Sequence, residues 1–113
     1  MSECLFCKII NKEIPSDPVY EDDLIFAFND INPQAPVHIL IVPKKHIGSL
    51  DDVQGTDAEL MGYMMLKIKD MAEKHGLTKG YRVVNNCGED GLQSVQHVHF
   101  HLLGGRKLLW PPG

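Results

Sequence analysis

Three histidines alternate with apolar residues near the end of this chain. His97, His99 and His101 are separated by Val98 and Phe100, and this period of two is typical of a β-strand with two different faces. Such a strand would turn its apolar side chains toward a core and its three imidazoles toward the other face. Three of the six histidines in the 113 residues lie in this run, so we interpret it as a site rather than as ordinary surface histidines.

A single metal centre does not explain the spacing of this run. A strand rises about 3.3 Å per residue, which separates His97 from His101 by roughly 13 Å along the backbone. Zinc holds nitrogen ligands at about 2.0–2.1 Å, so two ligands of one ion lie only about 4 Å apart. Neighbouring histidines could lean together, but three histidines on one straight strand cannot converge on one ion.

Covalent catalysis explains the run better. Imidazole is a nucleophile toward phosphorus, and neighbouring imidazoles can set its tautomer and exchange protons with it near neutral pH. Gly91, Gln93 and Ser94 lie just upstream, where backbone N–H groups and a hydroxyl could hold a phosphate. The run therefore predicts attack on a phosphate by one of the histidines.

The His-x-His-x-His run, followed by two apolar residues, resembles the signature of the histidine triad (HIT) superfamily of nucleotide hydrolases and transferases. Other segments are similar to the Hint branch of that superfamily, the purine-nucleoside phosphoramidases. These segments occur in the expected order and span nearly the whole chain: residues 28–38, 42–46, 80–84 and 110–113.

Composition bounds the class of protein. The length suits one domain, residues 1–113, and a net charge of −4 without a basic run argues against a nucleic-acid or membrane surface. No apolar run approaches the roughly 20 residues of a membrane span, and no signal peptide precedes the first motif. Three cysteines, an odd count, favour a reducing cytoplasm over a disulfide framework.

The elements that must position the histidines are short. Periodicity predicts a helix over residues 5–11, a hairpin of strands 19–21 and 24–28, and a strand over 80–85. Residues 37–42 form a nearly continuous apolar run, which indicates a central strand buried on both faces. With the histidine strand, the expected fold is α+β, a HIT-like antiparallel sheet of about five strands with one long and one short helix.

The long helix is predicted to begin at a capping box, Thr56 with Glu59, and to end at Gly76. Four of the five methionines lie on it, which favours packing against the sheet and also suits a partner surface. The resemblance implies a homodimer with this helix in the interface.

The resemblance also assigns roles to residues of the site. It implies that His99 is the nucleophile and that His97, His101 and His38 orient it and manage protons. By itself a carboxylate at Asp30 would be more often a turn former, but in this family it would bind the ribose hydroxyls. The remaining contacts are with the phosphoryl oxygens (Asn86, Gln93, Ser94), the base (Phe6, Ile9, Ile14, Phe28) and, from the partner's tail, the leaving group (Trp110).

The expected reaction is hydrolysis of the P–N bond of purine nucleoside 5′-phosphoramidates, or of the mixed anhydride of aminoacyl-adenylates. A nucleotidyl-His99 intermediate would release AMP or GMP, and this chemistry requires no metal. The alternatives are a nucleotidyl transferase and a non-catalytic nucleotide-binding regulatory module. Leu92, where a second glycine often follows Gly91, and Gln96, which replaces an aromatic residue, depart from the Hint pattern and could change the leaving-group preference.

Cys4 and Cys7 have a spacing that can hold zinc, but they supply only half of a tetrahedral site. A redox pair and incidental thiols are the alternatives. Because His99 must stay free to attack, His46 and His97 are the best candidates for the other two ligands. Some HIT proteins with the same N-terminal cysteines resemble this arrangement, so we expect a structural zinc.

Overall fold

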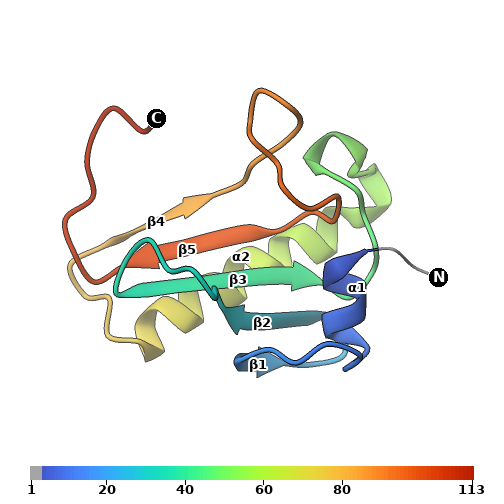
Figure 1. Ribbon diagram of the computed structural model, residues 1–113, viewed down its shortest axis with the longest axis horizontal. Helices are drawn as coiled ribbons and strands as arrows, with labels where there is room; N and C mark the ends of the chain where they lie inside the picture. Colours follow the sequence, from blue (N-terminus) through green and yellow to red (C-terminus); the bar gives the residue numbers. More distant parts are fainter. Residues whose placement is uncertain (1–3) are drawn as a thin grey trace.

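The computed structural model describes residues 4–113, which form one five-stranded antiparallel sheet in the order β1-β2-β3-β5-β4 (Figure 1). Each strand pairs with its neighbours in the antiparallel sense, so the sheet needs no parallel crossover. The strands are β1 (Pro18–Glu21), β2 (Ile25–Asn29), β3 (Val37–Pro43), β4 (Tyr81–Val84) and β5 (Phe100–Gly104).

Strand β3 is the centre of the sheet, and six of its seven residues are buried. Its register with β5 places Leu40 opposite His101 and Ile39 opposite Leu102. The expected hairpin is the β1–β2 pair, and Asp22 closes its turn by accepting hydrogen bonds from the backbone N–H groups of Leu24 and Ile25. The predicted central strand and hairpin are therefore present.

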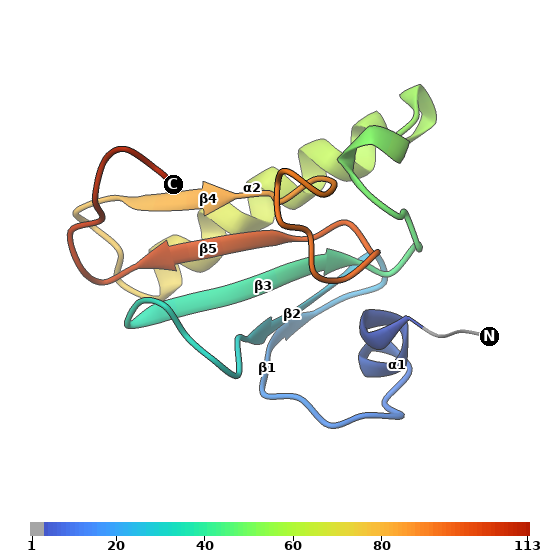
Figure 2. The same ribbon diagram turned by 45° about the horizontal axis from the view of Figure 1, so that its top comes forward.

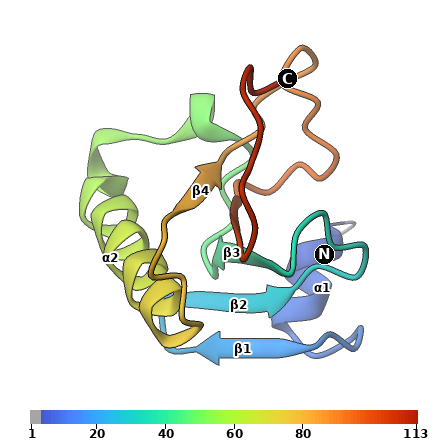
Figure 3. The ribbon, with the colours of Figure 1, turned by 90° about the vertical axis from the view of Figure 1, so that its left-hand side faces the viewer.

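The two helices cover opposite faces of the sheet (Figure 2 and Figure 3). Helix α2 (Ala58–Lys74) buries Met64, Ile68, Met71 and Ala72, at the spacing of one helix face, in a core with Ile39, Ile41 and Leu102. Helix α1 (Leu5–Ile10) buries Phe6 and Ile9 against a second cluster that includes Phe26, Phe28, Leu40 and Val42. The expected α+β fold with one long and one short helix is confirmed.

The histidine run separates the two faces as its alternation predicts. Val98, Phe100 and Leu102 belong to the core beneath α2, whereas the rings of His97 and His99 contact Phe6 of α1. Strand β5, however, begins only at Phe100, later than expected. The N–H of Val98 donates to Ile47 O at 2.6 Å, outside the register of the sheet, so His97 and His99 lie on an irregular segment before the strand.

The predicted capping box is wrong by two residues. Gln54 and Asp57 exchange the two capping hydrogen bonds, and a 3₁₀ turn over Gly55–Asp57 leads into α2, so Thr56 and Glu59 are not the pair. At the other end α2 stops at Lys74, and Gly76 follows with φ +73°, the left-handed conformation in which glycine ends helices. No helix within residues 4–113 has the length and apolar character needed to cross a membrane.

Alanine substitutions at two glycines test the backbone conformation assigned to each position. A Cβ added to Gly62 of α2 would have nothing within 4 Å, whereas Gly105 has φ +93° and a Cβ there would lie 2.8 Å from Pro36 Cβ. We expect Gly62→Ala to stabilise the protein by about 1 kcal/mol and Gly105→Ala to destabilise it by about 1–2 kcal/mol. Urea unfolding midpoints measure both changes. Shifts of the same sign in the two variants would contradict the assignment.

Candidate functional site

Four histidines gather on the α1 face of the sheet. His38 comes from β3, His101 from β5, and His97 and His99 from the segment that leads into β5. The first two histidines of the run are almost completely buried, with 0% of His97 and 2% of His99 exposed. This burial is rare for a polar ring and requires hydrogen-bond partners for its nitrogens.

The tautomer of His99 follows from its contacts. Its Nδ1 lies 2.7 Å from the carbonyl oxygen of His97, and because a carbonyl only accepts, Nδ1 must carry the hydrogen. The second nitrogen, Nε2, therefore keeps its lone pair. The Phe6 ring packs edge-on against His99 with 4.9 Å between ring centroids, so the orientation of the ring is held from the side as well.

A chain of hydrogen bonds joins Gln34, His38 and His101. The backbone N–H of Gln34 donates to His38 Nδ1 at 3.0 Å, which leaves the hydrogen of His38 on Nε2. That nitrogen donates to His101 Nδ1 at 2.9 Å and lies 3.5 Å from a carboxylate oxygen of Asp30. His101 must then carry its own hydrogen on Nε2, and its ring lies 5.2 Å from that of His99.

Burial keeps these histidines neutral. Desolvation is the main cause that lowers the pKa of His38, His97 and His99. The carboxylate of Asp30 acts in the opposite direction and raises the pKa of His38 and His99. The pKa of His101 falls to about 4, because burial and then the neighbouring His99 and His38 disfavour its cationic form. At neutral pH the site therefore offers a neutral imidazole with a lone pair on Nε2, His99, beside a neutral imidazole with a hydrogen on Nε2, His101.

Cys4, Cys7, His46 and His97 form a separate cluster whose ligand atoms all lie within 4.8 Å of one another. His97 donates from Nε2 to the carbonyl of Pro43 at 2.8 Å, so the lone pair on its Nδ1 faces the cysteines. Nδ1 of His97 lies 3.3 Å from Cys4 Sγ, 3.6 Å from Cys7 Sγ and 3.1 Å from His46 Nδ1.

These separations fit tetrahedral zinc. Zinc bonds of about 2.0–2.1 Å to nitrogen and about 2.3 Å to sulfur give edges of about 3.3 Å between two nitrogens and about 3.5 Å between nitrogen and sulfur. The fourth contact, Cys7 Sγ to His46 Nδ1, is 3.3 Å and agrees with the same geometry. Two thiols and two imidazoles are a donor set that zinc prefers. Asp30, His38 and His101 are also close enough to bind a metal, but the hydrogen bond between the two histidines already explains their approach.

The structure places the predicted base contacts together. Phe6, Ile9 and Phe28 are buried in one cluster with Ile14 packed against it, beside the ring of His99. Trp110 is 79% exposed, and its expected contact with the leaving group in a partner's site stays a prediction.

Two of the three predicted phosphate contacts have other partners within the chain. The Gln93 amide accepts from Gly88 N–H and donates to the carbonyls of Gly48 and Val95, so it braces the loop. Asn86 donates to Gly91 O at 2.6 Å, and Ser94 is exposed. Of the three residues, Ser94 is the one whose side chain makes no hydrogen bond within the described chain.

Leu92, one of the departures from the Hint pattern, has φ +61° and is 83% exposed. This left-handed conformation favours glycine, which is the residue that the Hint pattern often has at this position. The leucine side chain is instead presented to solvent beside Gln93.

Sequence reasoning missed residues that act on the histidines through the backbone. Asn85 donates its amide to His99 O at 2.8 Å, and its Oδ1 is buried without a partner among the described residues. Arg106 donates to the carbonyl of Gln34, the residue whose N–H sets the His38 tautomer. No sequence signal could have identified Gln34, because its peptide group and not its side chain is used.

Comparison with known proteins gives consistent matches. The family model described as HIT domain matches residues 11–108. A 14 kDa zinc-binding protein from Zea mays is 54% identical over 114 residues, which cover 99% of this chain and 89% of that protein.

Solved structures are similar over nearly the whole chain. A HIT family hydrolase from Legionella pneumophila Philadelphia 1 has a TM-score of 0.97 at 52% identity. The match covers 98% of this chain and 100% of the hydrolase chain. A histidine triad nucleotide-binding protein from Candida albicans has a TM-score of 0.82 at 33% identity. The match covers 98% of this chain and 85% of the Candida albicans chain.

The buried neutral histidines predict a pH dependence of stability. Because the pKa of His101 is lowered from 6.5 to about 4, the unfolded chain binds more protons than the folded chain between these values. Stability therefore falls as the pH falls through this window, by at most about 1.4 kcal/mol per pH unit for one such group. We expect His101→Asn to lose less stability than the wild type between pH 7 and pH 5, measured by urea unfolding. His75→Asn, at the exposed C-terminal end of α2, is the matched control, and equal losses in all three proteins would refute the prediction.

Proposed function

Because this chain belongs to the HIT domain family, we propose that it is a nucleotide-binding hydrolase of the Hint type. Its substrates are purine nucleoside 5′-phosphoramidates or aminoacyl-adenylates, and the reaction passes through a nucleotidyl-His99 intermediate. The observation that carries the proposal is the buried His99, whose Nδ1–H is held by the His97 carbonyl so that Nε2 keeps its lone pair.

Substrate would lie on the α1 face. The base packs against the apolar cluster of Phe6, Ile9, Ile14 and Phe28, and the ribose hydroxyls donate to the carboxylate of Asp30. One oxygen of Asp30 accepts from the Asn32 N–H at 2.8 Å and the other lies 3.5 Å from His38, which holds the carboxylate in place. Each carboxylate oxygen has a further lone pair for a hydroxyl.

In the first step Nε2 of His99 attacks the α-phosphorus and the bond from phosphorus to the leaving amine breaks. The imidazole becomes cationic, and the His97 carbonyl that accepts its Nδ1–H stabilises this charge. His101 carries its hydrogen on Nε2 beside His99, so it is placed to donate a hydrogen bond to the departing amine, which takes its proton from water.

In the second step water attacks the phosphorus of the nucleotidyl-His99 intermediate. The P–N bond to His99 breaks, AMP or GMP leaves, and one proton of the water is released to solvent, which balances the proton that the amine took in the first step. A nucleotidyl transferase would follow the same first step and use another acceptor in the second, whereas a binding module would form no intermediate.

The nucleophile is tested with adenosine 5′-phosphoramidate. His99→Ala should lower kcat by at least about 10³-fold while AMP binding remains, because the reacting atom is lost. His75→Ala removes a histidine from the end of α2, outside the cluster, and should keep wild-type activity. Intact mass measured on quenched wild type should show a nucleotidyl adduct. Substantial turnover by His99→Ala would refute the mechanism, and AMP binding without any adduct would favour the binding module.

We also propose that Cys4, Cys7, His46 and His97 hold a structural zinc. The ligand separations support it, as does the similarity to a protein named for zinc binding. Zinc there would supply a cross-link rather than a Lewis acid at the phosphate. The chain itself links α1 to the sheet through the contacts of Phe6 with His97 and His99.

Metal content and stability test the zinc proposal. Protein purified without added metal should contain about one zinc per chain, and Cys4→Ser/Cys7→Ser should contain less than a tenth of that and unfold at a lower temperature. Cys87→Ser, in the loop after β4, should keep both properties. A wild type with less than a tenth of an equivalent of zinc would leave the cysteines as thiols.

The proposal includes a homodimer, as the resemblance implies. Two features support it: β4 is an edge strand whose Tyr81 and Val83 are 43% and 38% exposed, and α2 exposes Leu66 and Met65 beside its buried face. In such a pair the C-terminal tail with Trp110 would meet the partner's substrate rather than its own.

A further inference from the structure

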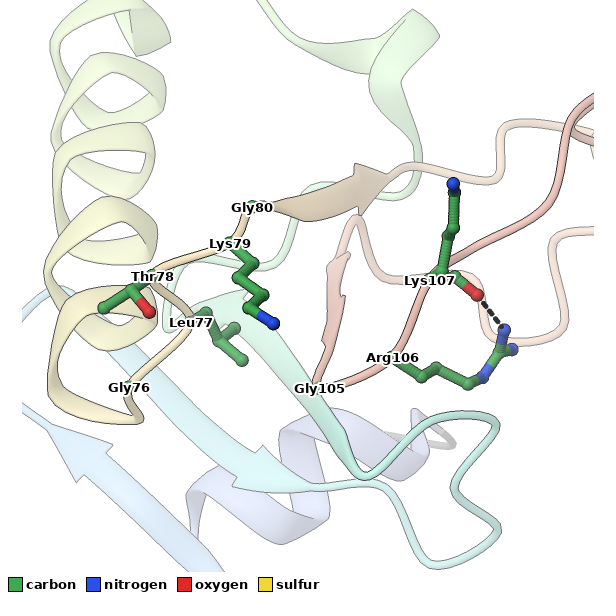
Figure 4. A pocket seen from close by; sticks show the side chains of 8 residues that line it. All are labelled: Gly76, Leu77, Thr78, Lys79, Gly80, Gly105, Arg106 and Lys107. Carbon is green, nitrogen blue, oxygen red and sulfur yellow. Dashed lines mark hydrogen bonds between the residues drawn. The ribbon is translucent and has the colours of Figure 1, made fainter.

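A hollow of about 670 Å³ opens at the end of the sheet away from α1. Its walls are the turn between α2 and β4 and the residues that follow β5 (Figure 4). Three lining glycines, Gly76, Gly80 and Gly105, have φ values of +73°, +111° and +93°. A Cβ added to Gly76 or Gly80 would meet nothing within 4 Å, so these two positions border open space.

All charged residues that line this hollow are cationic: Lys79, Arg106 and Lys107. Within residues 4–113 none of the three pairs with a carboxylate, since the ion pairs there use other cations. The chain as a whole has a net charge of −4, so three unpaired cations around one hollow are a local exception. A local excess of positive charge of this kind attracts anions.

The three cations are held differently. Arg106 donates to the carbonyls of Lys107 and Gln34, both at 3.0 Å, which fixes its guanidinium on the side of Gly105 away from Lys79 (Figure 4). Figure 4 shows the Lys79 ammonium reaching across the hollow toward Gly105, while the Lys107 ammonium points away from Arg106. The two lysines can therefore move onto a ligand without breaking a hydrogen bond within the described chain.

The C-terminus of α2 lies near the hollow, but its negative partial charge would repel an anion only weakly. Two of the last carbonyls of α2 are occupied, because Ala72 O accepts from Leu77 N–H and Glu73 O accepts from Gly76 N–H. These bonds reduce the negative charge that the C-terminus of a helix presents.

We propose that this basic hollow is a binding site for an oligophosphate, a group of two or more linked phosphates, separate from the histidine site. Lysine ammonium groups bind phosphate as point charges, and three cations around one hollow exceed what a single phosphate needs. The volume lies within the usual range for small-molecule sites, about 300–1,000 Å³. The source is either free oligophosphate or the phosphate tail of a nucleotide.

The probe is inorganic tripolyphosphate, titrated into the full-length protein with AMP present to occupy the histidine site. We expect backbone amide shifts in NMR spectra over residues 76–80 and 105–107. Lys79→Gln/Lys107→Gln should weaken binding by at least tenfold, and salt raised from 50 to 200 mM should weaken wild-type binding. A matched control, Lys8→Gln/Lys69→Gln, removes the same charge on the two helices and should bind as the wild type does.

A parallel titration with ATP distinguishes the sources. A dissociation constant for ATP at least tenfold below that of tripolyphosphate, with the same amides shifted, assigns the hollow to a nucleotide, and similar constants assign it to the free oligophosphate. Shifts confined to residues near the histidines, or equal loss of binding in both double variants, would overturn the proposal. Phosphoramidate turnover by Lys79→Gln/Lys107→Gln should stay at the wild-type value, so failure here is separate from failure of the proposed reaction.

Discussion

The arrangement of the site depends on the hydrogen bonds of His97. Its carbonyl accepts the Nδ1–H of His99, its Nε2–H donates to Pro43 O, and its Nδ1 faces Cys4, Cys7 and His46. One residue therefore sets the tautomer of the neighbouring imidazole, joins the segment before β5 to β3, and completes a candidate metal cluster. A change that rotates the His97 ring would disturb the last two at once, because both use its ring nitrogens.

Burial makes these hydrogen bonds obligatory. An imidazole removed from water without partners costs free energy, so each buried nitrogen must find a donor or an acceptor. The partners are mostly backbone groups, which cannot change protonation state, and they select one tautomer for each ring. The same burial lowers the pKa values and keeps a lone pair available at neutral pH. The fixed tautomers and the neutral state of these imidazoles thus have a common cause.

Much of the fold was predictable because its signals are local. The apolar run at 37–42, the alternation at 97–102 and the glycine after α2 each reflect the geometry of a few consecutive residues, and the structure agrees with them. The start of β5 and the capping of α2 were predicted wrongly. Both depend on competing partners, Ile47 O for Val98 N–H and Gln54 for Asp57, which local patterns do not rank.

The features of the site also separate into those set by local sequence and those set by distant partners. Residue types and spacing alone determined that three imidazoles share one face and that two cysteines lie one helical turn apart, because strand and helix periods dictate it. Only the tertiary structure decided which nitrogen of each ring is free and that residues 4, 7, 46 and 97 meet. It also decided that Gln93 braces a loop, that Asn85 holds His99 and that three cations surround one hollow. Those outcomes require partners distant in sequence, and their positions follow from packing α1, α2 and the sheet together.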